Sequence, residues 1–369
     1  MNVLILGTRG IPAQYGGFET FAENFSRYLV ARGHSVVVYC QSDTEGAPRR
    51  EIWQGIELVQ IYGGSGPRGT IAFDLACVRD AVTRPGIILT LGYNTAVFSL
   101  LYWLHRRRTL MNMDGIEWRR EKWSPIQRLW LRINEFAGAK LSTHLIADHP
   151  GIAGHLERLV NRDKITMIPY GADRTDRCCM KPACSLLSTV GLVANEYALI
   201  IARPEPENSL LEMVQAFSTR PRGIRLAVLG NYDPANSVYH RKVMDSASPE
   251  VLFLGPVYHS SLLSALRCNA LLYLHGHRVG GTNPALVEAL STQNAILAHD
   301  NIFNSWVAGP GSAYFKDAAD LDLLLDELIH DKPRLEAMRK HSRAQHERLF
   351  LQEPLLRQYE ELLERFADV

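Results

Sequence analysis

The residues best suited to chemistry gather in one glycine-rich stretch, residues 271–294. An apolar run leads into HGHRVGGTNP (residues 275–284), and the helical pattern ALVEAL follows. Proline is favoured in the first turn of a helix, so this order predicts a strand, a loop and a helix. Loop N–H groups and a helix N-terminus can hold a phosphate, and the carboxylate of Glu288 can accept hydrogen bonds from sugar hydroxyls. The stretch fits a nucleotide-sugar site and, equally, an ordinary helix start with an exposed glutamate.

Length and composition indicate a globular protein of two domains. The chain has 369 residues, 46% hydrophobic and 21% charged, which is too long for one compact core. A formal net charge of +1 argues against a nucleic-acid partner. The six cysteines are scattered apart from CCMKPAC at 178–184, where three sulfurs without an adjacent histidine argue against a closed zinc site. A reducing cytoplasm therefore fits the cysteines best.

Neither a signal peptide nor a membrane-spanning segment is expected. The N-terminal MNVLILGTRGIP has no basic n-region and no small-residue cleavage site, so it is interpreted as a strand. The longest apolar runs, such as TAVFSLLYWL at 95–104, are too short to span a bilayer.

The apolar segments form two successive α/β series. A strand at 3–6, a glycine loop, a helix that ends near Gly33 and a strand at 35–40 begin a doubly wound domain. The loop lacks GxGxxG, so the dinucleotide fingerprint is not met. A second series begins at Tyr197. The other expected strands are 57–62, 87–91, 109–113, 143–147, 224–229, 251–254 and 294–298, and IPYGAD at 168–173 is expected to be the last strand and turn of the first half. Helices are expected at 209–218, 260–267 and from about Ala318 onward.

These series set the expected domain boundaries. The first Rossmann-like domain covers residues 1–175, and an irregular, cysteine-bearing linker covers 176–194. The second Rossmann-like domain covers 195–350. The amphipathic end, 351–369, is expected to be a helix.

Five segments carry a resemblance to a known family: GTRGIPAQYGGFETFAENF, NMDGIEWRREKW, IPYGAD, RPEPENS and HRVGGTNPALVEAL. With two doubly wound domains, they resemble the GT-B glycosyltransferases and, within these, family 4, the retaining enzymes that use nucleotide-sugars. The resemblance implies a GT-B fold: two Rossmann-like domains facing across a cleft, the first on the acceptor side and the second binding the donor. The C-terminal helix would cross over and pack back toward the first domain.

The same segments are similar to the bacterial rhamnosyltransferase-like branch. That branch builds capsule, O-antigen and cell-wall polysaccharides, often from dTDP-L-rhamnose. Family 4 is marked by an arginine and a lysine after the first strand of the second domain, and by two glutamates eight residues apart. Arg203 and Glu288 match the arginine and the second glutamate, whereas Asn208 replaces the lysine and Gly280 the first glutamate. Gly281 keeps the family's glycine, and Thr282 and Asn283 depart from its usual Phe-Gly.

The resemblance implies a donor site around Arg203. A guanidinium fork suits a diphosphate, although a surface salt bridge with Glu205 or Glu207 is the alternative. Asn208 can hydrogen-bond a phosphate without adding charge. The helix start at Thr282 and Asn283 would add backbone donors.

Further donor contacts are expected from both halves. Gly16 and Gly17 resemble the loop that closes over the donor phosphates, or they form an ordinary turn, and Arg9 is a weaker candidate beside them. His277 would contact the donor or pack structurally. Tyr258 would lie along the nucleobase or belong to the core.

Asp114 and Glu117 are the expected acceptor-side residues. Asp114 lies in NMDG after a predicted strand, where ligands bind at the carboxyl edge of a sheet. It would orient an acceptor hydroxyl or stabilise oxocarbenium charge, and an Asp-Gly turn is the alternative. With Arg203 and Glu288, Asp114 completes the expected catalytic set.

Arginines alternate with aromatic residues over 105–132, in HRRR, WRREKW and RLWLR. This pattern suits an anionic bilayer surface, and a solvated basic helix is the alternative. Because the expected acceptor is a lipid-linked saccharide, we expect a cytoplasmic protein held peripherally at the inner face of the plasma membrane.

The residues and the resemblance together predict a retaining hexosyltransferase that needs no metal or cofactor. It would move a sugar, with L-rhamnose suggested by the branch, from a nucleoside diphosphate to the lipid-linked acceptor. In this family the leaving diphosphate itself takes the acceptor proton. The alternatives are a nucleotide-sugar epimerase and a catalytically silent sugar-nucleotide-binding subunit, which the absent first glutamate keeps open.

Overall fold

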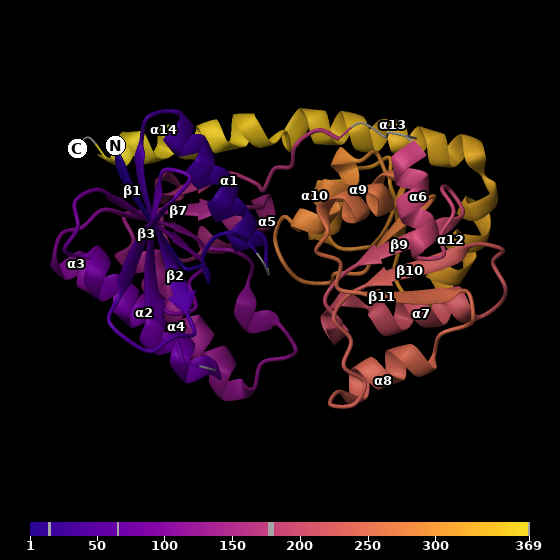
Figure 1. Cartoon of the computed structure of the whole chain (residues 1–369), viewed down its shortest axis with the longest axis horizontal. Helices are drawn as coiled ribbons and strands as arrows, with labels where there is room; N and C mark the ends of the chain where they lie inside the picture. Colours follow the sequence, from indigo (N-terminus) through magenta and orange to yellow (C-terminus); the bar gives the residue numbers. More distant parts are fainter. Residues whose placement is uncertain (14–15, 65, 176–180, 368–369) are drawn as a thin grey trace. The chain divides into compact units, whose positions relative to one another are not determined.

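The computed structural model describes residues 1–13, 16–64, 66–175 and 181–367 (Figure 1). The chain divides into two compact units. Unit 1 comprises Met1–Arg119, Trp123–Pro169 and the C-terminal segment from Glu353, and unit 2 comprises Arg120–Lys122 and Tyr170–Gln352.

Unit 1 contains an eight-stranded sheet in the order β3-β4-β2-β1-β5-β6-β7-β8, parallel except for β3. Its central strands are apolar on both faces, because helices cover both sides of a parallel sheet. The strands are β1 (Asn2–Leu6), β2 (Ser35–Ser42), β3 (Arg49–Trp53), β4 (Ile56–Tyr62), β5 (Ile87–Leu91), β6 (Thr109–Asn112), β7 (His144–Ala147) and β8 (Ile165–Met167). The helices are α1 (Gly17–Ala31), α2 (Gly66–Ala81), α3 (Ser99–Leu104), α4 (Pro125–Leu141), α5 (Pro150–Leu156) and α14 (Gln352–Ala367), with short 3-10 turns η1 (Ala96–Phe98), η2 (Glu117–Arg119) and η3 (Arg162–Lys164).

Helix α14 returns to unit 1 and packs on it, as expected for the C-terminal helix. Asn112 Nδ2 donates to the Tyr359 hydroxyl at 2.8 Å, and the Tyr359 ring lies 4.7 Å from that of Phe21 and 5.5 Å from that of Phe25. These contacts join α14 to α1 and β6, so the last helix belongs to the core of the first unit.

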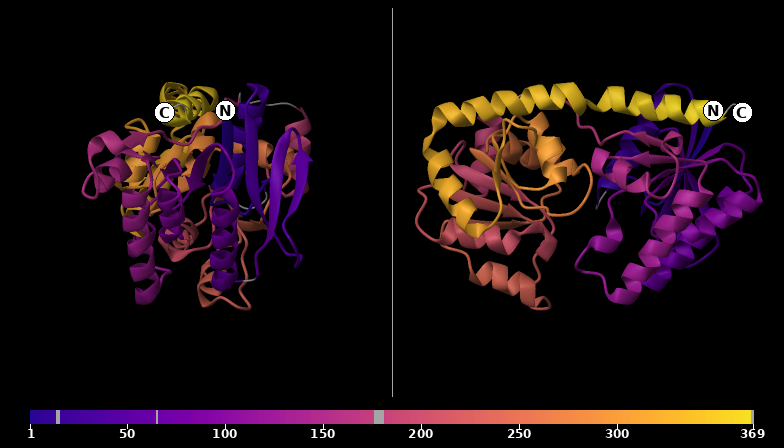
Figure 2. Two further views of the ribbon diagram at one scale, coloured as in Figure 1. Left: turned by 90° about the vertical axis from the view of Figure 1, so that its left-hand side faces the viewer. Right: turned by 180° about the vertical axis from the view of Figure 1, so that it is seen from behind.

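Unit 2 contains a six-stranded parallel sheet in the order β11-β10-β9-β12-β13-β14. Ala198 and Ile200 of β9 face one apolar cluster, and Tyr197 and Leu199 face the other, because neighbouring strand residues point to opposite faces. Helices therefore cover both faces of the sheet (Figure 2). The strands are β9 (Tyr197–Ile201), β10 (Arg225–Leu229), β11 (Val251–Gly255), β12 (Leu272–His275), β13 (Ile296–His299) and β14 (Ala313–Phe315). The helices are α6 (Lys181–Thr189), α7 (Leu210–Ser218), α8 (Val238–Asp245), α9 (Ser260–Cys268), α10 (Pro284–Ser291), α11 (Ile302–Ala308), α12 (Ala318–His330) and α13 (Lys332–Leu349), with η4 (Pro206–Asn208).

The two Rossmann-like sheets confirm the predicted fold class, but two local expectations were wrong. The supposedly irregular linker contains α6, whose Leu187 is buried in the core of unit 2. Residues 168–173 form no strand, and Ile165–Met167 pairs with β7 instead. Cys178 and Cys179, like the side chain of Cys184, lie outside the described residues.

Candidate functional site

The loops that follow β9 and β12 form the candidate donor site of unit 2. These two strands are neighbours, but the chain continues from β9 toward one edge of the sheet and from β12 toward the other. Ligands bind at the carboxyl ends of parallel strands where the strand order reverses in this way. The β9 loop carries Arg203 and Asn208, and the β12 loop carries His277 and residues 280–283, so the fold brings these predicted residues to one edge.

Arg278, which the sequence analysis did not identify, ties the two loops together. Its N–H donates to the Glu207 carbonyl at 2.9 Å, and its guanidinium donates to the Pro206 carbonyl at 3.0 Å. A Cβ at Gly276 would lie 2.3 Å from the Asn208 carbonyl oxygen, so only glycine permits this approach. The two loops are therefore held as one rigid surface.

Arg203 is exposed, and no described acidic residue forms an ion pair with it. Glu207, one of the two proposed salt-bridge partners, is buried and lies 3.3 Å from Arg120 instead. The Arg203 carbonyl accepts from Asn208 Nδ2 at 2.8 Å. The guanidinium is thus available to an anion, and Asn208 shapes the loop that carries it. A phosphate contact by Asn208 itself stays a prediction.

The glycine-rich loop meets the start of α10 as the sequence predicted. Asn283 is the N-cap, and its side-chain oxygen accepts from the Ala285 N–H at 3.0 Å. Among the hydrogen bonds of the described residues, none uses the N–H of Gly281 or of Asn283. Gly280 has φ +141°, a conformation that strains any L-residue. The loop therefore presents backbone donors to an anion, on a path that favours glycine at position 280.

Glu288 forms an ion pair with Arg267 of α9. Its carboxylate is about one-third exposed, whereas the Arg267 side chain is largely covered. The ion pair with Arg267 thus fixes the orientation of the Glu288 carboxylate. The partner could not be recognised from the sequence, because it is 21 residues away and depends on how α9 packs.

His275 and His277 stack at the end of β12, with ring centroids 4.4 Å apart and planes 11° from parallel. Burial, and then His299, lowers the pKa of His275 to about 3. Burial, His275, Arg120 and Arg203 together hold the pKa of His277 well below its usual value. Both rings are therefore neutral at pH 7, and the buried Nδ1 of His277 has no hydrogen-bond partner. His277 can offer a neutral ring nitrogen beside Arg203, but no positive charge.

Two asparagines that the sequence analysis missed hold the His277 loop. The His277 carbonyl accepts from Asn301 Nδ2 at 2.9 Å and from Asn304 Nδ2 at 2.8 Å. Asn301 is also the N-cap of α11. An asparagine before an apolar helical segment is a recognisable N-cap signal, but its second role as a support for the loop is not.

Tyr258 follows β11 and is 70% exposed, which excludes the core alternative. It lies at the same carboxyl edge as the β9 and β12 loops, in the loop that follows the edge strand β11. A nucleobase contact by this ring stays a prediction.

The acceptor-side candidates lie at the carboxyl edge of unit 1. Asp114 follows β6 with φ +49°, and its N–H donates to Asn112 Oδ1 at 2.9 Å. Left-handed backbone at a residue other than glycine is uncommon and often marks functional positions, although aspartate tolerates it. The Glu117 N–H donates to the Tyr93 hydroxyl at 2.8 Å, and Glu117 is buried. Both residues are held in place, and their contact with an acceptor stays a prediction.

Gly16 and Gly17 lie at the start of α1, after β1, where the strand order of unit 1 reverses between β1 and β5. A cavity of about 270 Å³ opens there, and it is lined by Arg9 and by Asp74, which the sequence analysis missed. The Thr95 hydroxyl donates to Asp74 at 2.8 Å, and burial raises the Asp74 pKa to about 6. The start of α1 therefore borders a cavity whose lining includes a guanidinium and a buried carboxyl group.

Only one group of described residues has spacing suited to a metal ion: His34, Glu360 and Glu364. It lies at the amino edge of the unit 1 sheet, before β2. Arg32 Nε and His34 Nε2 each approach Glu360 Oε1 to 2.7 Å. A guanidinium on the same oxygen identifies this group as an ion-pair network.

The basic-aromatic region 105–132 borders an exposed apolar face. Helix α4 carries exposed apolar residues at helical spacing and lies beside α3. In the part of the chain that the structure describes, no helix combines the length and hydropathy that crossing a bilayer requires. The exposed residues, called the α3–α4 face, are Leu100, Trp103, Leu104, Ile126, Leu129, Trp130, Ile133 and Phe136.

Comparisons with known proteins agree with this fold. Residues 1–173 match a family model described as a domain of unknown function (DUF1972). The fold is similar to sucrose-phosphate synthase from Thermosynechococcus elongatus, with a TM-score of 0.80 and 17% identity over 99% of this chain and 98% of that one. It is also similar to HepE from Anabaena in complex with UDP and glucose, with a TM-score of 0.78 and 15% identity over 99% of this chain and 100% of that one.

The chain has the GT-B fold. An α,α-trehalose-phosphate synthase (UDP-forming) from Burkholderia vietnamiensis shares it, with a TM-score of 0.73 and 12% identity over 99% of both chains. No curated protein sequence was found to match. The GT-B fold accounts for the two sheets and for the return of α14 to unit 1.

Proposed function

We propose that this GT-B chain is a retaining glycosyltransferase of family 4 that uses a nucleoside-diphosphate sugar. One observation carries the proposal: at the β9–β12 edge, the unpaired guanidinium of Arg203 lies on the same rigid surface as the free N–H groups of Gly281 and Asn283. A diphosphate needs such a combination of fixed charge and backbone donors. HepE was crystallised with UDP and with UDP-glucose, which supports the same ligand class here.

The residues would divide the reaction between binding and charge stabilisation. Arg203 and the loop donors would stabilise the charge that grows on the leaving diphosphate. Glu288, held by Arg267, would accept hydrogen bonds from donor hydroxyls, and Asp114 would orient the acceptor hydroxyl. The departing diphosphate would take the acceptor proton, so neither a protein base nor a metal is required.

We further propose that the acceptor is a lipid-linked saccharide and that the donor sugar is L-rhamnose from dTDP-rhamnose. The five segments of the rhamnosyltransferase-like branch support the sugar. The α3–α4 face, with arginines beside it, supports peripheral contact with the inner face of the plasma membrane. Bacterial O-antigen or capsule synthesis is the setting that fits both.

A thermal-shift panel of UDP, dTDP and GDP with their sugar conjugates tests the donor site. A ligand that binds only the folded state raises the melting temperature by RT ln(1 + [L]/Kd). We expect ligands of one base to raise the melting temperature of the wild type. Arg203→Ala should lose most of this rise, whereas the control Arg343→Ala, which changes an exposed arginine of α13, should keep it. An equal shift in Arg203→Ala, or no shift in the wild type, would contradict the proposal.

A further inference from the structure

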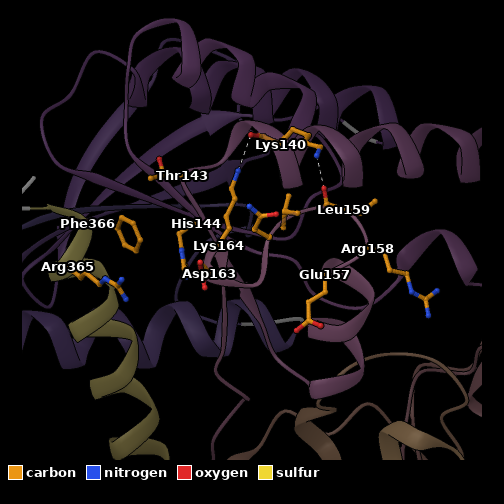
Figure 3. Close-up of a pocket in the computed structure, with 12 residues that line it drawn as sticks. Lys140, Thr143, His144, Glu157, Arg158, Leu159, Asp163, Lys164, Arg365 and Phe366 are labelled. Atoms are coloured by element: carbon orange, nitrogen blue, oxygen red, sulfur yellow. Dashed lines mark hydrogen bonds between the residues drawn. The ribbon is translucent and has the colours of Figure 1, made fainter.

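An open hollow of about 770 Å³ lies at the amino edge of the unit 1 sheet, opposite the edge that carries Asp114. Lys140 stands in the last turn of α4, and Lys164 directly precedes β8 (Figure 3). Arg365 and Phe366 approach from the end of α14 (Figure 3). The proposed transfer reaction uses none of these residues.

The lining of the hollow carries more positive than negative charge. Arg162 Nε lies 3.2 Å from Glu157 Oε1, so this lining carboxylate already has a partner. Within the described part of the chain, no acidic group pairs with any of the lining cations. The cations are Lys140, Arg158, Lys164 and Arg365, and the acids are Glu157 and Asp163.

The two lysines are fixed in place while most of their donors stay unused. Lys164 Nζ donates to the Lys140 carbonyl at 3.0 Å, and Lys140 Nζ donates to the Leu159 carbonyl at 2.7 Å. An ammonium has three N–H donors, so each keeps capacity for a ligand. Burial, and then the charge of Lys140, lowers the pKa of Lys164. An anion bound between the two lysines would relieve this repulsion.

An aromatic and hydroxyl frame holds the other side of the hollow. His144 Nε2 lies 2.8 Å from Thr166 Oγ1, and the His144 ring lies 4.8 Å from the ring of Phe366. Arg108 donates to the Phe366 carbonyl at 3.2 Å. The end of α14, with Arg365, is therefore docked against the strands before any ligand arrives.

We propose that this hollow binds a small phosphate-bearing anion at a site separate from the donor site. Phosphate oxygens accept from donors that approach from several directions, and lysine binds phosphate as a point charge. Cations from α4, the residue before β8 and α14 line the same hollow, and the volume suits a small ligand. The phosphate belongs either to a soluble phosphate ester or to a lipid headgroup. The inference rests on unit 1 alone and not on the proposed transferase activity.

Lysine acylation followed by mass spectrometry tests the site, because the reagent reports each amine separately. The probes are pyrophosphate and a water-soluble glycerophosphodiester, the headgroup fragment without its acyl chains. We expect one probe to slow labelling of Lys140 and Lys164 by about fivefold at several times its Kd. Lys242 and Lys316 of unit 2 serve as internal controls. Protection by pyrophosphate alone would identify a soluble ester, and protection by the diester a headgroup.

Variants separate a built site from general anion attraction. Lys164→Met should abolish the protection of Lys140, whereas Lys242→Met should leave it unchanged. The proposal is overturned if neither probe protects Lys164 in the folded wild type, or if the controls are protected equally. It is also overturned if Lys140 stays protected in folded Lys164→Met.

Discussion

Arg203 and Gly280 show how single residues set the character of the candidate donor site. Neither Glu205 nor Glu207 pairs with Arg203, and Glu207 is buried and paired with Arg120, so the guanidinium stays available. Position 280, where the resembled family has its first glutamate, has φ +141°. The absence of the glutamate is therefore consistent with the backbone conformation at position 280, which is unfavourable for any residue with a side chain.

Glu288 should matter more for turnover than for folding. Glu288→Gln keeps the shape but loses the charge that Arg267 fixes, and a charged hydrogen bond contributes about 1.5–3 kcal/mol. Turnover should fall roughly ten- to a hundredfold, measured with one donor and with circular dichroism as the folding check. In Glu288→Gln the Arg267 guanidinium loses its partner, which could destabilise the fold. The double variant Arg267→Gln/Glu288→Gln removes both charges and controls for this effect. A folded Glu288→Gln enzyme at full rate would refute the role.

Gly280→Glu should impair the enzyme although it restores the carboxylate of the resembled family. Its Cβ would meet open space, but φ +141° is unfavourable for any side chain, so the loop must change its path. We expect lower kcat with the same donor. The N–H groups of Gly281 and Asn283 would then lose the orientation in which we propose they hold the diphosphate. A gain in activity would show that the loop tolerates the family pattern and that this account of the site is wrong.

Among single residues, the sequence predicted those that directly follow an apolar strand pattern. Arg203, His277 and the glycine loop all follow apolar strands, and the structure brings them to one edge. Arg267, Arg278 and the loop-supporting role of Asn304 escaped notice. Their partners are 21 to 72 residues away, and only tertiary packing brings them together.

At the scale of elements, apolar runs predicted most strands, and polar edge strands escaped. Strand β3, RREIW, lacks an apolar pattern and is held by its pairing with β4. Its turn has positive φ at Gln54 and Gly55, as a two-residue hairpin requires. Helix α6 was missed because the cysteine cluster beside it suggested an irregular linker. The leucines of α6 in fact pack into the core of unit 2.

The buried carboxylate of Glu360 should stabilise the attachment of α14 in a pH-dependent way. Burial alone would raise the pKa of Glu360, but hydrogen bonds from Arg32, His34 and Tyr28 lower it overall. A depressed carboxyl pKa contributes stability above the unfolded value, and this contribution is lost as the pH falls through the folded pKa. Glu360→Gln should therefore lower the melting temperature at pH 7 and have less effect near pH 3.

Calorimetry at the two pH values measures this difference. Glu361→Gln, on the exposed side of α14, is the matched control and should change little at either pH. An equal loss for Glu360→Gln at both pH values would mean that packing, and not the charge, secures the helix.

The α3–α4 face should bind anionic vesicles through apolar and electrostatic contributions together. Trp103 is 60% exposed and Ile126 82% exposed, an unfavourable state for side chains of this size without a partner surface. Trp103→Ser/Ile126→Ser/Ile133→Ser should weaken vesicle binding at least about tenfold, because each buried apolar side chain contributes about 1.5–3 kcal/mol. Sedimentation with vesicles at two salt concentrations measures both contributions.

Leu323→Ser, an exposed leucine of α12 in unit 2, is the control and should bind as the wild type does. Binding that salt does not weaken, or a triple variant that binds fully, would remove this face from the account.

At the scale of the whole molecule, both units repeat one plan. In each, the candidate residues lie at the carboxyl edge of a sheet, and part of them lies where the strand order reverses. In unit 1, the opposite edge carries the Glu360 network and the cationic hollow, both involving α14. Helix α14 thus packs on unit 1 and reaches the edge away from the candidate site residues, and it contributes no residue to the proposed reaction.

Acceptor-dependent release of a nucleoside diphosphate from its sugar, in EDTA, tests the central claim most directly. The wild type is incubated with each nucleotide-sugar, with and without a lipid pyrophosphate-linked saccharide, and both the released nucleotide and the lengthened saccharide are followed by mass spectrometry. We expect one donor to be consumed in step with acceptor lengthening, and Arg203→Ala to lose the reaction. Conversion of a donor without acceptor into an isomeric nucleotide-sugar would indicate an epimerase. Binding without any turnover across the panel would contradict the transferase claim.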